Sequence, residues 1–175
     1  MKKKDAVFDE TQRLKRWFLL LLLIPVNLIF IAGCVVQIGL SKPWGDNPMS
    51  DVGLIITTIL FLLFTANMLF ISMQTFVDKE GVSVSVWLFP FYRQTKSFLW
   101  DDISEVYITK YRPISDYGGW GIRLGFNGTA YNMSGNIALV LLFKNGKKIL
   151  IGTNNPDELS EVLYQLGKTD EKQYG

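Results

Sequence analysis

Residues 17–40 read WFLLLLLIPVNLIFIAGCVVQIGL, and this stretch determines the architecture of the chain. From Trp17 to Ser41 there is no charged side chain, and 19 of these 25 residues are apolar. At a rise of about 1.5 Å per residue, a helix of this length crosses the ~30 Å hydrocarbon core of a bilayer. We therefore predict a transmembrane helix over residues 17–41.

A second uncharged stretch runs from Val52 to Val77 and has the core LIITTILFLLFTANMLFISM at residues 54–73. Between the two stretches, residues 42–48 read KPWGDNP, a turn rich in residues that interrupt helices. The pattern predicts an external loop over residues 42–51 and a second transmembrane helix over residues 52–74. The two helices would form an antiparallel hairpin.

The charges that flank the hairpin indicate its orientation. Residues 1–16 carry six basic side chains against three acidic ones, whereas the loop carries one lysine and two aspartates. Positive side chains are retained on the cytoplasmic side of a membrane. We therefore expect a cytoplasmic basic arm over residues 1–16, both termini in the cytoplasm and a multi-pass protein of the cell (inner) membrane.

The composition of the 175-residue chain excludes several classes of function. A net charge of +2 is too small for a nucleic-acid-binding protein, which would carry a clear basic excess. The chain has no histidine and one cysteine, Cys34, so zinc sites, histidine acid–base chemistry and disulfide frameworks are not expected. Ile31-Ala32-Gly33-Cys34 also fits a bacterial lipoprotein processing site. The apolar run continues to Leu40, which favours an inert cysteine within the membrane.

Residues 75–167 have the patterns of a small mainly-β domain. Val82, Val84, Val86 and Leu88 alternate with other residues, which is typical of a strand with one buried face. Asn127-Gly128 and Asn145-Gly146 each separate two apolar runs, and such dipeptides favour β-hairpin turns because they accept positive φ. We predict about seven antiparallel strands in a bent sheet or barrel.

A single helix is predicted at the end of this domain. Asn155 is a candidate N-cap, Pro156 suits the first turn, and Glu158 stands three residues after the cap. The residues that follow place one apolar stripe on the helix, made of Leu159, Val162, Leu163 and Leu166. This helix would cap the sheet, and residues 168–175 would form a polar tail.

Several motifs resemble the bacterial pleckstrin-homology-like domains. They are Asp78–Val82 (DKEGV), Trp100–Ile103 (WDDI) and Pro156–Leu159 (PDEL), with Tyr117–Arg123 and Ala130–Gly135 in the middle of the domain. Over residues 17–167 the chain resembles small bacterial membrane proteins that combine two N-terminal spans with such a domain. The resemblance implies binding or scaffolding, with no reaction attached.

Phosphoinositide binding is the first function that a pleckstrin-like fold suggests. In eukaryotic members it depends on basic residues in the first hairpin loop. Here that loop is Asp78-Lys79-Glu80-Gly81, with two acidic residues and one basic residue. This departure argues against inositol-lipid recognition.

The segment 110–136 is the best candidate for a binding surface because it combines aromatic and arginine side chains with six glycines. A partner strand added to an exposed sheet edge would be a natural mode of binding. Trp120 and Tyr131 could instead fill the core, and that alternative stays open. The candidate site residues are Arg112, Tyr117, Trp120, Arg123, Tyr131 and Asn132.

The sequence favours a non-enzymatic, membrane-anchored binding or scaffold module with a protein partner or self-association. No catalytic residue, metal or cofactor is expected. A homo-oligomeric two-helix channel or transporter subunit is the alternative, supported by the uncharged polar residues Asn27, Thr58, Thr65 and Asn67 within the spans. A membrane enzyme that uses the tyrosines, arginines and aspartate of residues 112–123 is less favoured.

Overall fold

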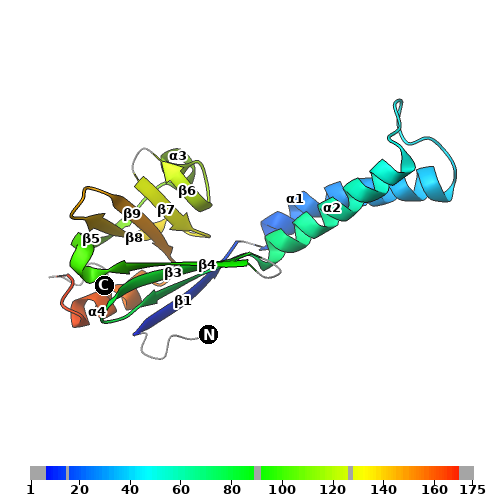
Figure 1. Cartoon of the computed structure of the whole chain (residues 1–175). Coiled ribbons are helices and arrows are strands. Elements are labelled where there is room, and N and C mark those ends of the chain that lie inside the picture. Colours follow the sequence, from blue (N-terminus) through cyan, green and yellow to red (C-terminus); the bar gives the residue numbers. More distant parts are fainter. Residues whose placement is uncertain (1–6, 15, 89–91, 126–127, 170–175) are drawn as a thin grey trace. The chain divides into compact units, whose positions relative to one another are not determined.

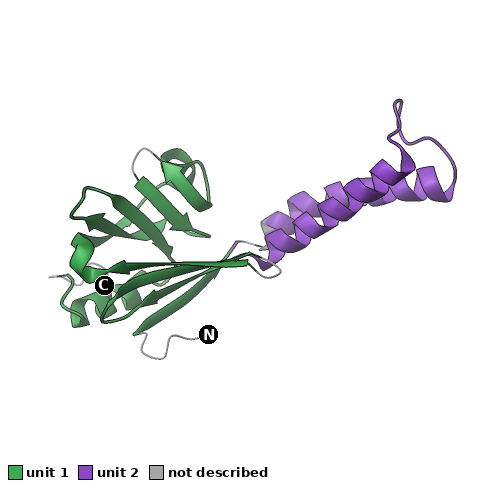
Figure 2. Ribbon diagram, viewed as in Figure 1, with its two compact units in different colours: residues 1–13, 72–175 green, residues 14–71 purple. Residues whose placement is uncertain are grey.

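The chain divides into two compact units, one helical and one rich in β-structure (Figure 2). The helical unit comprises residues 14–71, and the β-rich unit combines residues 1–13 with residues 72–175. The computed structural model describes residues 7–14, 16–88, 92–125 and 128–169. The chain thus begins in the β-rich unit, passes through the helical unit and then returns to complete the β-rich unit.

The helical unit contains α1 (Arg16–Cys34), which continues into the π-helical segment η1 (Val35–Gly39), and α2 (Asp51–Phe70). Both helices are long and apolar enough to cross a membrane. Most of their apolar side chains are exposed, and Leu21 and Val52 each keep 67 % of their surface. Soluble proteins rarely expose apolar surface of this extent to water, so this surface fits a lipid environment.

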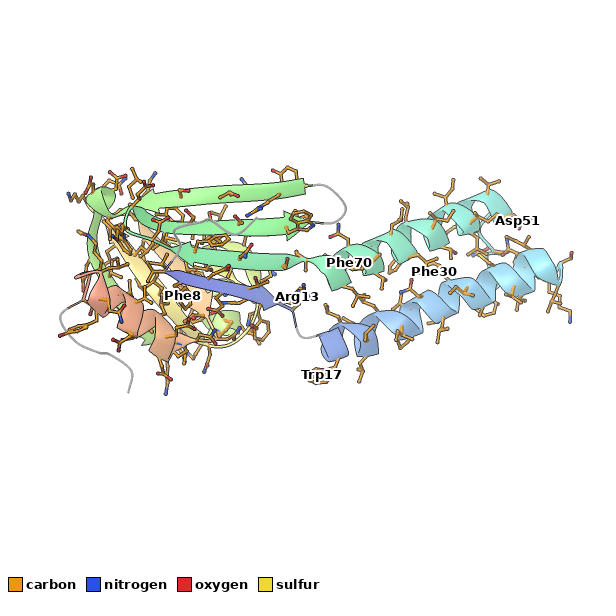
Figure 3. All side chains as sticks on the ribbon, turned by 90° about the horizontal axis from the view of Figure 1, so that it is seen from below. Phe8, Arg13, Trp17, Phe30, Asp51 and Phe70 are labelled. Atoms are coloured by element: carbon orange, nitrogen blue, oxygen red, sulfur yellow. The ribbon has the colours of Figure 1, made fainter. Side chains whose placement is uncertain are left out.

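Polar and aromatic contacts join α1 to α2. The side-chain amide of Asn27 donates to Thr65 Oγ1 at 2.7 Å, and Cys34 Sγ lies 3.2 Å from Thr58 Oγ1. The rings of Phe30, labelled in Figure 3, and Phe61 lie 4.9 Å apart. Asn27 thus forms a hydrogen bond between the two helices, and Cys34 packs against the second helix.

The β-rich unit contains nine strands among the described residues, in two sheets (Figure 1). Sheet A has the order β1-β2-β3-β4, and sheet B has the order β5-β8-β9-β7-β6. The strands of sheet A are β1 (Phe8–Arg13), β2 (Ser72–Val77), β3 (Gly81–Leu88) and β4 (Tyr92–Leu99). Those of sheet B are β5 (Ile103–Lys110), β6 (Gly121–Gly125), β7 (Gly128–Asn132), β8 (Ile137–Phe143) and β9 (Lys148–Thr153).

The predicted mainly-β domain is confirmed, but its sheets differ from the expectation. About seven antiparallel strands in one bent sheet or barrel were predicted, whereas the structure has separate sheets of four and five strands that do not close. One pair, β7 with β9, is parallel, and Thr129 lies opposite Ile149. The parallel pair arises because β9 inserts between β8 and the β6–β7 hairpin, an order that local patterns do not encode.

Residues 8–13 fall in the range predicted as a basic arm, but they form β1 at the edge of sheet A. Phe8 pairs with Val77, and Arg13 pairs with Ser72; Figure 3 labels Phe8 and Arg13 at the two ends of the strand. The burial alternates residue by residue along β1, as it does in a strand with one covered face. The second predicted helix also ends earlier, at Phe70, because Ser72–Val77 forms β2.

The buried face of β1 is joined to the end of β9. Glu10 Oε2 accepts a hydrogen bond from the Thr153 hydroxyl at 2.6 Å, and Glu10 Oε1 accepts one from the Asn154 amide at 2.8 Å. The side-chain amide of Gln12 donates to the carbonyl oxygen of Gly152 at 2.6 Å. These bonds connect sheet A to sheet B through residues about 140 positions apart.

Two of the resemblance motifs form one structural element. Asp78 Oδ1 accepts hydrogen bonds from the backbone amides of Glu80 and Gly81, so Asp78–Gly81 is a tight turn as predicted. The segment η2 (Trp100–Asp102) follows β4, and the indole of Trp100 donates to the carbonyl oxygen of Asp78 at 2.9 Å. The buried Trp100 therefore stabilises the turn between β2 and β3.

The hairpins and the terminal helix match the sequence patterns in outline. Gly128 and Gly146 have φ angles of +105° and +81°, as expected, but Asn145 lacks the positive φ that was also expected at an Asn-Gly turn. Asn127 lies outside the described residues. Helix α4 (Pro156–Gln165) buries Leu159, Val162 and Leu163 as predicted. The predicted N-cap does not form, since the side chain of Asn155 makes no capping hydrogen bond. The backbone amide of Asn155 donates to Thr153 Oγ1.

The core requires both sheets and α4. Its largest fully buried side chains come from β1, β2, β8, β9 and the helix, and include Phe8, Met73, Leu139, Leu141, Ile151, Leu159 and Leu163. Since burial of such a side chain contributes about 2–3 kcal/mol, the N-terminal strand adds to stability although the helical unit separates it from the rest of its sheet.

The hydrogen bonds of Glu10 yield a testable prediction. Glu10→Ala leaves the Thr153 hydroxyl and the Asn154 amide without their acceptor, so we expect a loss of about 2–3 kcal/mol in the free energy of unfolding of the β-rich unit. Urea unfolding in detergent, followed by tryptophan fluorescence, measures this loss. Asp9→Ala on the exposed face of the same strand is the control, with an expected change below about 0.5 kcal/mol. Equal losses in both variants would contradict the assigned role.

Candidate binding cleft

The six residues predicted as a binding surface do not form one site in the structure. Arg112, whose side chain is 83 % exposed, pairs with Asp116 at 3.7 Å at the start of α3 (Pro113–Tyr117). Tyr117 is buried and packs against Tyr111, with their rings 6.2 Å apart. An exposed ion pair at this spacing contributes little to stability, and a buried tyrosine offers no surface to a partner.

Trp120, Arg123 and Asn132 stabilise the segment between α3 and β6. The Trp120 indole donates to the carbonyl oxygen of Gly135 at 3.2 Å, and Arg123 Nε donates to the carbonyl oxygen of Trp120 at 3.1 Å. Asn132 is fully buried, and its Oδ1 accepts a hydrogen bond from the Gly121 amide at 2.8 Å. These three side chains form hydrogen bonds with backbone groups of their own region, so their contacts stabilise the local fold.

Tyr131 lines a cavity between the two sheets. It is buried on β7, its ring is 6.3 Å from that of Phe98 on β4, and the ammonium group of Lys96 lies 5.8 Å from the ring centroid. The contact is a cation–π interaction between the two sheets. The sequence left open whether Trp120 and Tyr131 fill the core. The two residues differ in this respect, because Tyr131 is buried and Trp120 keeps 39 % of its surface.

The cavity at Tyr131 is a cleft of about 1020 Å³ between sheets A and B, which we call the intersheet cleft. Its walls come from β4, η2, the β6–β7 hairpin and the β8–β9 hairpin. A volume of this size suits a ligand larger than a single ion. The residues that line it are Lys96, Phe98, Asp102, Gly125, Gly128, Thr129, Tyr131, Leu142, Phe143, Lys144, Asn145, Gly146, Lys147, Lys148 and Ile149.

The charges of the intersheet cleft are mostly positive. Four lysines line it, namely Lys96, Lys144, Lys147 and Lys148, against one acidic residue, Asp102. Within the described ranges none of the four ammonium groups forms an ion pair. In the register Lys148 lies opposite Leu142, which packs against the cluster on the other face of sheet B. The positive charge at the cleft therefore comes mainly from Lys96, Lys144 and Lys147, and it raises the local concentration of anions.

The backbone of the β8–β9 hairpin places three of these lysines at the cleft. The Phe143 amide donates to the carbonyl oxygen of Lys147 at 2.8 Å, and the Lys144 amide donates to that of Asp102 at 3.0 Å. The Asn145 side chain accepts from the Lys147 amide at 3.0 Å. The turn is therefore attached to η2 as well as to its own strands, which restricts where Lys144 and Lys147 lie.

Aromatic rings form the inner part of the cleft. The rings of Phe98 and Phe143 lie 5.8 Å apart in an edge-to-face arrangement, and Tyr131 packs on the other side of Phe98. The cleft thus combines a positively charged rim with an apolar interior. This combination suits a ligand that carries both negative charge and apolar groups.

Sequence reasoning missed the lysines of the cleft. The stretch Lys144–Lys148 reads KNGKK, and by itself it indicates only a hairpin turn with exposed lysines. The alternation of Lys96 and Phe98 on β4 is a second signal, but it becomes informative only when the position of β4 beside sheet B is known.

The described residues contain no group of three or more histidine, cysteine, aspartate or glutamate side chains that could hold a metal ion. No protein-family model matches the chain, and no curated protein is detectably similar to it.

The opposite face of sheet B carries a second cluster, which yields a pH prediction. Tyr111 and Tyr117 pack there on Ala130, Ala138, Val140 and Leu150. Burial raises the pKa of Tyr111 from 10.0 to about 12, partly offset by the Asn132 side chain. Between pH 10 and 12 the unfolded state releases this proton and the folded state keeps it, so stability falls as the pH rises.

Tyr111→Phe is expected to make this alkaline loss of stability less steep, and denaturant unfolding at a series of pH values between 9 and 12 measures it. Burial also raises the pKa of Tyr117, so part of the slope will remain. Tyr164→Phe, at a position 49 % exposed on α4, is the control and should leave the slope unchanged. An unaltered slope in the Tyr111 variant would rule out the assignment.

Proposed function

We propose that the chain is a non-enzymatic, membrane-anchored binding module whose ligand site is the intersheet cleft. The observation that carries this proposal is the group of lysines, Lys96, Lys144 and Lys147, around a cleft of about 1020 Å³ with an aromatic interior. Side chains able to bind an anion are gathered here. The ligand is an anionic partner with apolar groups, and its binding needs no cofactor.

Anchoring in the membrane is supported by the helical unit. Both α1 and α2 are long and apolar enough to cross a bilayer, and most of their apolar side chains are exposed. The basic side chains of residues 1–16 favour a cytoplasmic position for the N-terminus. Two crossings then bring the rest of the β-rich unit to the same side, at the inner face of the cell membrane.

A pleckstrin-homology-like fold is the finer description that we propose for the β-rich unit. Two sheets followed by a C-terminal helix agree with it. The DKEGV and WDDI motifs support it further, because Trp100 bonds to Asp78 and thereby joins the two motifs. The cleft lysines do not belong to the first hairpin, so the eukaryotic mode of inositol-lipid binding is not proposed here.

The channel alternative gains less support. Asn27 bonds to Thr65, and Thr58 lies against Cys34, so these polar groups bond to one another within one hairpin. Polar side chains that are used in this way stabilise helix packing. These contacts favour a packing role for Asn27, Thr58 and Thr65 over the lining of an ion path.

Site-specific photo-crosslinking in cells tests the proposal. A benzophenone amino acid replaces Thr129, which lines the cleft, or Tyr164, which is exposed on α4. We expect a discrete adduct from position 129 and none from position 164. The double substitution Lys96→Glu with Lys147→Glu should reduce the adduct by about tenfold, since it reverses the charge of the rim.

Folding of the double variant is checked by its thermal unfolding, because both lysines are exposed and their exchange should cost little stability. Equal labelling from the two positions, or an adduct that the charge reversal leaves unchanged, would disprove a lysine-dependent site in the cleft.

A further inference from the structure

We propose that the occupant of the intersheet cleft is an extended acidic polypeptide segment of a partner protein, which adds to sheet A as a strand beside β4. The inference rests on the proposed function of the cleft and names the class of its ligand. Its basis is the position of β4, which is both a wall of the cleft and an edge of its sheet.

Among the strands of the described residues, β4 has a neighbour on one side and none on the other. In sheet A it pairs with β3 alone, and seven of its eight residues are exposed. A strand in this position presents a row of backbone amide and carbonyl groups that another chain can pair with. Peptide binding by strand addition uses these groups for affinity.

The edge strand β1 is different, because it is already covered. Glu10 and Gln12 on its buried face bond to the end of β9, and α4 packs beside it. The two sheets are therefore linked along the β1 side. On the β4 side the space between them is the intersheet cleft.

The backbone of β4 is regular over its described length, although charged side chains such as Arg93 and Lys96 also protect sheet edges against unspecific pairing. Its register with β3 runs without a shift from Gly81 opposite Leu99 to Leu88 opposite Tyr92. By contrast, β5 has an irregularity between Ile103 and Glu105. Bulges are a common protection of sheet edges, and β4 has none over its described length.

The register also indicates which side chains a new strand would meet. Lys96 lies opposite Val84 and Phe98 lies opposite Val82, so both point to the face on which the valines are buried. This face is the one that looks into the cleft, where Phe98 contacts Tyr131 and Phe143. Alternate side chains of an added strand would continue the same face.

Charge determines the composition of the segment. Side chains of the added strand that point into the cleft would meet Lys96 and the lysines of the β8–β9 hairpin, with Asp102 as the one opposing acid. Acidic side chains at alternate positions satisfy this arrangement, and an apolar side chain among them fits against Phe98 and Phe143. Lysine at the same positions would be repelled.

An anionic lipid headgroup could use the same lysines, but it has no backbone to pair with β4. Amide hydrogen exchange separates the two ligands, because strand addition protects backbone amides of β4 and contact with a headgroup does not. The backbone amides of β4 that point away from β3 are the ones whose exchange rate reports strand addition.

The experiment uses the full chain in nanodiscs of phosphatidylcholine. The probe is a peptide of about eight residues that alternates glutamate and valine, a length that matches an ordinary strand. The matched control alternates lysine and valine, and a third sample replaces part of the lipid with phosphatidylglycerol. Exchange is followed by mass spectrometry on fragments that cover residues 92–99, with fragments that cover β1 as the internal reference.

We expect the glutamate peptide to slow exchange in residues 92–99 by about tenfold and to leave β1 unchanged. The lysine peptide and phosphatidylglycerol should have no such effect. The double variant Lys96→Glu with Lys147→Glu should reverse the preference, so that the lysine peptide protects β4. A reversed preference also shows that the variant is folded.

Two results would overturn the inference. One is binding of the glutamate peptide, measured by fluorescence anisotropy, without protection of β4, and the other is protection by phosphatidylglycerol alone. If a charge-dependent crosslink from Thr129 is still found, the cleft remains a binding site with another kind of ligand. If that crosslink is missing as well, the proposed function fails together with the inference.

Discussion

The structure of the β-rich unit depends on the contact between β1 and the end of β9. Glu10 and Gln12, from the first residues of the chain, bond to Gly152, Thr153 and Asn154 near its end. The bonds of Gln12 to Gly152 and of Glu10 to Thr153 are buried, and the bond of Glu10 to Asn154 is partly buried, so loss of these bonds costs free energy. They link sheet A to sheet B at one side and make the N-terminal segment part of the domain.

The location of the cleft follows from this contact. Because the sheets are linked along β1, the space between them opens along the other edge of sheet A, at β4. Phe98 contacts Tyr131 and Phe143 at the inner end of that space, and the lysines of the β8–β9 hairpin lie at its rim. An unpaired strand edge, an apolar interior and positive charge therefore occur together.

The position of the helical unit in the chain is a further consequence. The helices lie between β1 and β2, and these two strands are neighbours in sheet A, with Arg13 opposite Ser72. The chain therefore leaves and re-enters the β-rich unit at adjacent strands. The β-rich unit is attached to the helices through two strands of its own sheet.

The sequence by itself determined the features that depend on near neighbours in the chain. The length and apolarity of the two helices, the turn at Asp78, the glycines of the hairpins and the stripe on α4 are local patterns, and each was predicted. The tertiary structure alone decided which distant segments meet. It placed β1 in sheet A, made β7 and β9 parallel, and separated Tyr131 from the other predicted site residues. It also brought Lys96 to the lysines of a hairpin tip. Strand pairing and charge clusters between distant segments depend on the register and order of the strands. Burial of the whole core sets that register and order, and a short sequence pattern carries no information about it.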